Sequence, residues 1–180
     1  MLSRKIGTVF ALLVSLVTAP KLLADEANTK QLLFAARDGN VLQTLALLEQ
    51  GLSPNVSDDV GITPLVLAAY HGHIHVMNAL KEAGADTCAL DHKGSNAMMG
   101  AASRGRINVI KWMLEHGDCN INQQNYAGQT ALVIAASFRH DEIIDLLLEY
   151  GADSMLRDAR GNTAASLAIA HGRHALADKL

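Results

Sequence analysis

Three histidines at alternate positions form the densest set of metal-ligand side chains in the sequence. His71, His73 and His75 read H-x-H-x-H, and imidazole is a common ligand of transition metals. A metal site also needs ligands that converge, and no cysteine or carboxylate stands nearby at a suitable spacing. We therefore expect no metal site. A ligand or metal carrier that uses these histidines is kept as an alternative function.

The residue combinations that support catalysis are missing. The sequence contains no G-x-S-x-G nucleophile motif and no glycine-rich loop of the kind that binds phosphates. Neither a nucleophile beside a base nor a pair of carboxylates in a cleft can be identified. We expect a protein that is not an enzyme and that uses no cofactor.

The two cysteines, Cys88 and Cys119, stand one repeat apart in the repeat series described below. Export to an oxidising compartment would permit a disulfide between them. The backbones of stacked repeats typically lie farther apart than the ~7 Å between Cα atoms that a disulfide tolerates. We expect two separate, half-buried side chains, and the sequence leaves the disulfide open.

The first residues differ in composition from the rest of the chain. Arg4 and Lys5 provide a basic start, residues 6–17 are mostly apolar, and small residues follow up to Ala24. This order is typical of a secretory signal peptide, and the apolar stretch is shorter than the roughly 20 residues of a membrane helix. We expect a signal peptide over residues 1–24 and a periplasmic or secreted mature protein. An uncleaved anchor is the alternative.

Net charge argues against a nucleic-acid partner. The whole chain carries a formal charge of −3. Cleavage would remove Arg4, Lys5 and Lys21 and no acidic residue, which lowers the net charge by three, to −6. Phosphate backbones repel such a chain, because it has no run of Lys or Arg to offset the acidic residues. We expect a monomer with a protein partner, no nucleic acid, and no stable membrane insertion after cleavage.

Residues 25–180 are organised as internal repeats, which are the elements that must position any site. Glycines in register open segments that read G-I-T-P-L-V-L-A-A, G-S-N-A-M-M-G-A-A, G-Q-T-A-L-V-I-A-A and G-N-T-A-A-S-L-A-I, starting at Gly61, Gly94, Gly128 and Gly161. A period of 33 or 34 residues indicates a solenoid of stacked units. The approximate units are 28–60, 61–93, 94–127, 128–160 and 161–180, and the third carries one extra residue within 118–125.

The residue pattern within each unit predicts two short helices and an extended loop. Thr63 can cap the first helix, with Pro64 in its first position. Paired alanines keep this helix thin, and the second helix carries an apolar stripe. Because the chain is 49% hydrophobic and 4% aromatic, we expect an all-α fold with an aliphatic core, in which Trp112 packs between repeats. Gln43 and Thr44 replace an apolar pair and predict a polar face at the N-terminal end.

The pattern resembles the ankyrin-repeat family, most closely in G-I-T-P-L-V-L-A-A-Y-H-G-H at 61–73 and L-L-L-E-Y-G-A-D at 146–153. The resemblance implies a helix–turn–helix solenoid of about five repeats that binds proteins on its concave face. It also implies that Asp58, Asp91 and Asp158 are loop residues. Arg139 departs from the pattern by replacing a turn glycine.

Candidate binding residues stand where the repeat leaves side chains free, at the end of the first helix and at the loop tips. Such aromatic and basic residues often carry binding energy. They are Tyr70, His71, His92, Lys93, Arg104, Tyr126, Phe138, Arg160 and His171. The function expected is a non-catalytic interaction module acting after export. The resemblance extends to small exported ankyrin proteins of Gram-negative bacteria, some of which support periplasmic oxidative-stress enzymes such as catalase. A secreted effector or an antitoxin-like binder is a further alternative.

Overall fold

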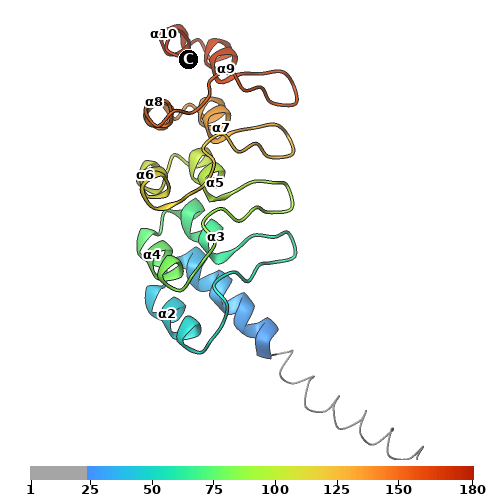
Figure 1. The fold of residues 1–180 in the computed structure, drawn as a ribbon, viewed down its shortest axis with the longest axis vertical. Helices are drawn as coiled ribbons and strands as arrows, with labels where there is room; N and C mark the ends of the chain where they lie inside the picture. The colour runs from blue at the N-terminus through green and yellow to red at the C-terminus, as the bar shows by residue number, and fades with distance from the viewer. Residues whose placement is uncertain (1–23) are drawn as a thin grey trace, which may run out of the picture.

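The computed structural model describes residues 24–180, in which helices form two stacked rows and the loops project to one side (Figure 1). Residues 24–38 are helical. The inner row, nearer the loops, contains α3 (Pro64–His71), α5 (Ala97–Ser103), α7 (Ala131–Phe138) and α9 (Ala164–Ala170). The outer row contains α2 (Val41–Glu49), α4 (Ile74–Glu82), α6 (Ile107–His116), α8 (Asp141–Glu149) and α10 (His174–Ala177). Within residues 24–180 there is no strand, and the predicted all-α solenoid is confirmed. The predicted signal peptide lies outside the described residues except for Ala24.

Buried polar residues begin the inner helices, as the sequence predicts. The side chains of Thr63, Asn96, Thr130 and Thr163 each accept a hydrogen bond from the backbone N–H three residues ahead. Each bond satisfies a donor that has no partner within its helix. Since all four residues are buried, water has little access to replace these bonds, and the caps define where each unit starts.

Alanine forms the contact surface between inner helices. Ala68, Ala101 and Ala135 have no exposed surface, and α3, α5, α7 and α9 pack against one another in sequence order. The short side chains let the helix backbones approach closely, while larger aliphatic residues of the outer helices fill the rest of the core. This packing leaves little space for a larger side chain in the inner row.

The expectation of two separate cysteines is wrong. Cys88 and Cys119 form a disulfide, and their Cα atoms lie 5.3 Å apart. The reason is how α6 ends: Gly117 is extended, with φ −106° and ψ 133°, whereas Gly84 and Gly151 at the equivalent positions have φ 88° and 84°. In the third unit, which carries the extra residue, the chain therefore leaves the end of α6 in a different direction. That direction brings Cys119 beside the preceding unit.

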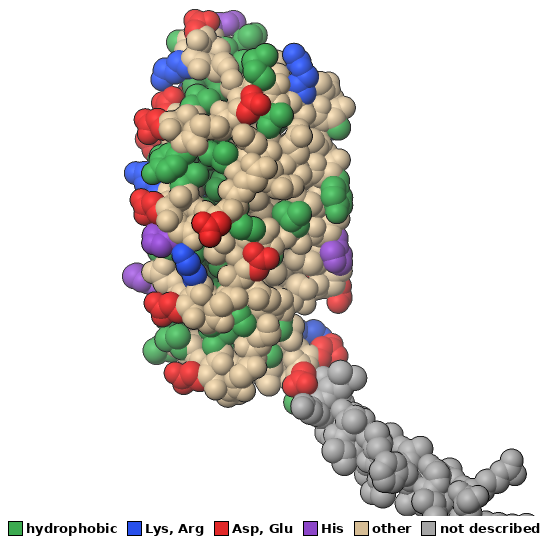
Figure 2. Space-filling model, in the orientation of Figure 1, with side chains coloured by type: hydrophobic (Ala, Val, Ile, Leu, Met, Phe, Trp, Pro, Cys, Tyr) green, Lys and Arg blue, Asp and Glu red, His purple; other side chains and the backbone are tan. Residues whose placement is uncertain are grey.

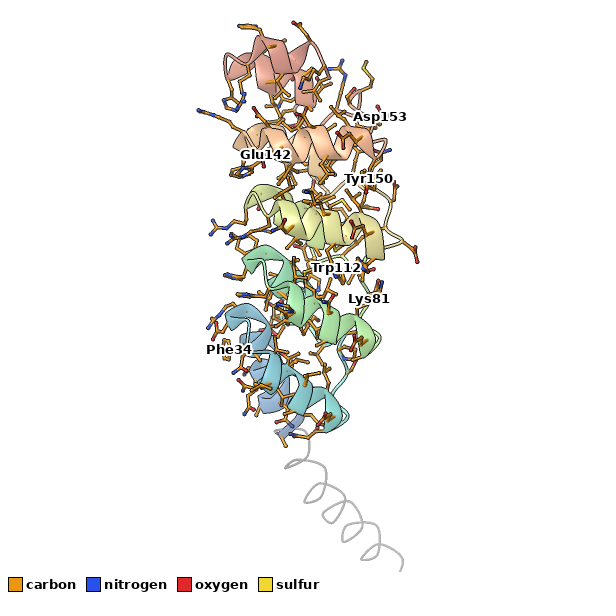
Figure 3. All side chains as sticks on the ribbon, turned by 90° about the vertical axis from the view of Figure 1, so that its left-hand side faces the viewer. Phe34, Lys81, Trp112, Glu142, Tyr150 and Asp153 are labelled. Carbon is orange, nitrogen blue, oxygen red and sulfur yellow. A yellow bond between two sulfur atoms is a disulfide. The ribbon has the colours of Figure 1, made fainter. Side chains whose placement is uncertain are left out.

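Trp112 packs between outer helices, as predicted, and is 5% exposed. Its Nε1 donates to Asn78 Oδ1 at 2.6 Å. The Lys81 ammonium lies 5.7 Å from the indole centroid and donates to the His116 carbonyl at 2.6 Å. Figure 3 shows Lys81 and Trp112 on neighbouring helices of the outer row. The α4–α6 junction therefore has both polar and covalent links.

The prediction of a polar face at the N-terminal end of the stack is wrong in part. Thr44 is fully buried, and its hydroxyl donates to the Asn40 carbonyl at 2.9 Å. It holds the position that Met77 holds in α4, and the bond to its own helix makes the hydroxyl tolerable in the core. Leu42, by contrast, is 81% exposed, so α2 presents an apolar side chain to solvent.

Candidate functional site

The predicted binding residues lie in two groups at opposite ends of the inner helices. We call the first the turn-end group: Tyr70, His71, Arg104, Phe138 and His171, at or just after the ends of α3, α5, α7 and α9. We call the second the loop-tip group: His92, Lys93, Tyr126 and Arg160, in the loops that precede inner helices. Helix α3 has 8 residues and is therefore about 12 Å long. A partner that contacts both groups must span that length.

In the turn-end group the structure brings Tyr70, His71 and Arg104 together. The guanidinium carbon of Arg104 lies 4.9 Å from the Tyr70 ring centroid, and the His71 ring meets Tyr70 edge-on at 5.2 Å. Arg104 is exposed, and the two rings are half-buried. Phe138 is 58% exposed and occupies the equivalent position on α7, and half-buried His171 follows α9. The group forms a row across successive repeats.

The sequence analysis missed a second row at this edge. Its members follow the turn residue between an inner and an outer helix: His73 follows Gly72, Arg106 follows Gly105, and His140 follows Arg139. These residues extend a side-chain nitrogen toward a carbonyl near the end of the preceding inner helix. The nitrogen–oxygen distances are 3.0 Å from His73 to Arg37, 3.4 Å from Arg106 to Tyr70, and 3.4 Å from His140 to Ser103. A signal was present in the sequence, because a basic residue follows four of the five turn residues, namely Gly72, Gly105, Arg139 and Gly172, whereas Asn40 follows Gly39.

The turn glycines permit this contact. A Cβ atom on Gly39 would lie 2.6 Å from the His73 ring, and one on Gly105 would lie 2.8 Å from the His140 ring. Both glycines also have positive φ, which other residues adopt at a cost. Each glycine is therefore required both for its turn and for the approach of the next repeat.

The loop-tip group is partly explained by the framework. The backbone N–H groups of His92 and Tyr126 donate to Val60 and Lys93 of the preceding loop, both at 2.9 Å. One edge of the Tyr126 ring lies against Gly94, whose added Cβ would be 2.9 Å from it. Tyr126 nevertheless stays 81% exposed. The interpretation that the repeat does not require Tyr126 therefore holds for its outer ring surface only.

Positive groups surround His71. Burial lowers the pKa of His71, and the charges of His73, Arg104, Arg106 and Arg37 lower it further. The Asp38 carboxylate interacts with His71 electrostatically, and a hydrogen bond from Arg37 at 2.8 Å holds the pKa of Asp38 low. The edge of the inner helices is thus locally cationic in a chain that is acidic overall.

The structure also shows where the clustered histidines and the loop aspartates lie within residues 24–180. No group of three or more His, Cys, Asp or Glu residues there is placed to hold a metal ion, and the rings of His71 and His73 stack in parallel at 6.1 Å. Asp58, Asp91 and Asp158 each accept two backbone N–H bonds from their own loops. None of the helices between residues 24 and 180 combines the length and the apolar composition of a membrane-spanning segment.

Comparison with known proteins finds the same repeat. A family model of three ankyrin repeats matches residues 32–125, and a model of many copies matches residues 113–168. A putative ankyrin repeat protein, YahD, of Escherichia coli (strain K12) is 36% identical over 75 residues, which cover 39% of this chain and 37% of that protein. A putative ankyrin repeat protein of Rickettsia bellii (strain RML369-C) is 36% identical over 59 residues, covering 33% and 35%. Alpha-latrotoxin-Lt1a of Latrodectus tredecimguttatus is 42% identical over 52 residues, covering 29% and 4%. The matches therefore span little more than a third of either bacterial relative.

Proposed function

Because the chain belongs to the ankyrin-repeat family, we propose that it is a non-catalytic module that binds a protein partner on the concave face along its inner helices. Ankyrin repeats are generally protein–protein interaction modules. The observation that carries the proposal is the turn-end group. Arg104 and Phe138 are exposed at central repeats, and aromatic and arginine side chains in such positions commonly dominate binding energy.

Export is the second part of the proposal, with the periplasm or the extracellular space as the destination. The basic and apolar start of the chain supports it. The disulfide between Cys88 and Cys119 supports it independently, because structural disulfides form and persist in oxidising compartments and are rare in the cytosol. A role beside a periplasmic oxidative-stress enzyme is a narrower form of the proposal, and it is supported only by the resemblance to small exported ankyrin proteins.

Capture of the partner from the native compartment tests the binding surface. Phe138→Ala and Tyr126→Ala should each weaken capture and affinity, at a cost of about 2 kcal/mol if the residue is a hot spot. Lys111→Ala and Glu149→Ala on exposed parts of α6 and α8 are the matched controls and should change little. Thermal unfolding of all four variants separates binding from folding. Weakened capture in the controls, with full capture in the two aromatic variants, would move the site to the outer helices.

A further inference from the structure

A cluster of arginine and histidine side chains surrounds the end of α3 and belongs to three successive repeats. We call Arg37, His71, His73, Arg104 and Arg106 the cationic cluster. His73 lies 3.0 Å from the Arg37 carbonyl, Arg106 donates to the Tyr70 carbonyl at 3.4 Å, and the Arg104 guanidinium stacks on the Tyr70 ring. Figure 3 shows nitrogen-ended side chains projecting along the edge that carries Phe34 and Glu142, opposite the edge with Lys81 and Tyr150.

The carboxylates of the fold leave this cluster largely unneutralised. Arg37 pairs with Asp38 at 2.8 Å. Among residues 24–180, neither Arg104 nor Arg106 forms a salt bridge. Three arginines against one aspartate leave two formal positive charges at neutral pH. Part of this charge has a structural use, because cations stabilise the C-terminal ends of helices. The exposed guanidinium of Arg104 is not explained in that way, since it faces an aromatic ring rather than a carbonyl.

A hollow lies beside the cluster. A cavity of about 240 Å³ opens between the starts of α4 and α6, and its lining includes His71, Arg106 and Asn108. A guanidinium group offers paired N–H donors that match the two oxygens of a carboxylate. Arg104 is held in place by the Tyr70 ring, so less side-chain entropy is lost when it binds.

We propose that the cationic cluster binds an acidic segment, rich in Asp and Glu, of the partner protein. This inference rests on the proposed function and deepens it. Charge complementarity supports this occupant. A long polyanion such as nucleic acid fits less well, because acidic side chains recur down the outer-helix side of the molecule (Figure 2). The cluster is confined to one end of three neighbouring repeats and suits a short acidic segment.

The pH dependence of binding follows from the groups that face His71. These are Arg37 and Asp38 before α2, His73 before α4, Arg104 after α5 and Arg106 before α6. Because burial and four positive groups lower its pKa, His71 is mainly neutral in the free protein at neutral pH. Carboxylates placed beside it would raise that pKa, so binding would take up a proton. Affinity should therefore rise as pH falls from neutral.

A model peptide tests the inference. The probe is a fluorescein-labelled peptide of alternating Glu and Gly, and the control peptide has Gln in place of Glu. Binding to the disulfide-bonded protein is measured by fluorescence anisotropy at low salt. We expect the Glu peptide to bind, more tightly at about pH 6 than at about pH 7.5, and the Gln peptide not to bind. Arg104→Gln and Arg106→Gln should each weaken binding about threefold or more.

Lys111→Gln removes one positive charge from an exposed position of α6 outside the cluster and should leave binding unchanged. Arg106→Lys keeps the charge but loses the paired N–H donors, so it should weaken binding less than Arg106→Gln does, and thermal unfolding of both variants separates binding from folding. Equal binding of the Gln peptide would overturn the inference, as would equal weakening by Lys111→Gln or tighter binding of a single-stranded oligonucleotide.

If partner capture depends on Phe138 while the Glu peptide fails to bind, this inference is overturned and the proposed function stands. If the peptide behaves as expected while capture ignores Phe138 and Tyr126, the proposed surface is overturned instead.

Discussion

Cys88 and Cys119 are joined by a disulfide across the junction between α4 and α6, at a sequence separation of 31. A loop of that length loses considerable freedom in the unfolded chain when it is closed. Reduction, or replacement of both cysteines by serine, should therefore lower the free energy of unfolding by about 2–4 kcal/mol. Urea denaturation with and without reductant measures the loss. The double serine variant should be insensitive to reductant, and two titratable thiols in the unreduced, unfolded protein would contradict the prediction.

Ala68 and Ala135 line the packed contact between inner helices, and each has no exposed surface. Changing either to Leu should lower the free energy of unfolding by about 1–3 kcal/mol, because the added atoms have no space without moving a neighbouring helix. Ala46→Leu makes the same change at an exposed position of α2 and serves as the control. Thermal or urea unfolding compares the three variants. Equal stability of all three would show that the packed face lies elsewhere.

Asn78 accepts a hydrogen bond from the indole N–H of Trp112, the one tryptophan of the chain. Asn78→Ala should cost about 1 kcal/mol or more, since it leaves a largely buried N–H without its partner. Tryptophan fluorescence during urea unfolding gives both the stability and a spectral report on the indole. Asn108→Ala, at an exposed position of α6, should change neither. An unchanged midpoint and emission maximum in Asn78→Ala would rule out the bond.

His71 should titrate below the ordinary histidine pKa of 6.5, because burial and then nearby positive groups disfavour its charged form. Arg104→Gln removes one of those charges and should raise the His71 pKa, whereas Lys111→Gln should not. NMR titration of the imidazole signals measures both effects. Since the unfolded chain takes up the proton more readily, His71 should reduce stability as pH falls from about 6.5 through its folded pKa. A His71→Gln variant should lose that part of the pH dependence.

The proposed export predicts a mature N-terminus at Asp25, after removal of residues 1–24. N-terminal sequencing of protein recovered from the periplasm or the medium is the measurement. Replacing Arg4 and Lys5 by Glu should reduce export, because the basic start of a signal peptide is needed for its recognition. Recovery of intact Met1 in a membrane fraction would replace the exported form with an anchored one.

The predictions that held for the fold depend on local chemistry. The Thr63 cap and the buried Ala68 could be read from the repeat, because each follows from hydrogen bonds or spacing within one unit. The polar end face failed at Thr44, since its hydroxyl bonds to its own helix and becomes acceptable in the core. The candidate residues were predicted at the end of the first helix and at the loop tips, and the structure places these two groups at opposite ends of the inner helices.

The stack of helix pairs follows from the sequence, because a repeat in register specifies the same short-range hydrogen bonds and the same apolar faces in each unit. Which side chains of different units meet depends instead on the tertiary structure. The disulfide between Cys88 and Cys119 and the stacking of Arg104 on Tyr70 depend on how far one unit is translated and turned relative to the next. The extended conformation of Gly117 changes that relation at one junction, and the extra residue of that unit indicates an irregular loop without specifying which residues it brings together.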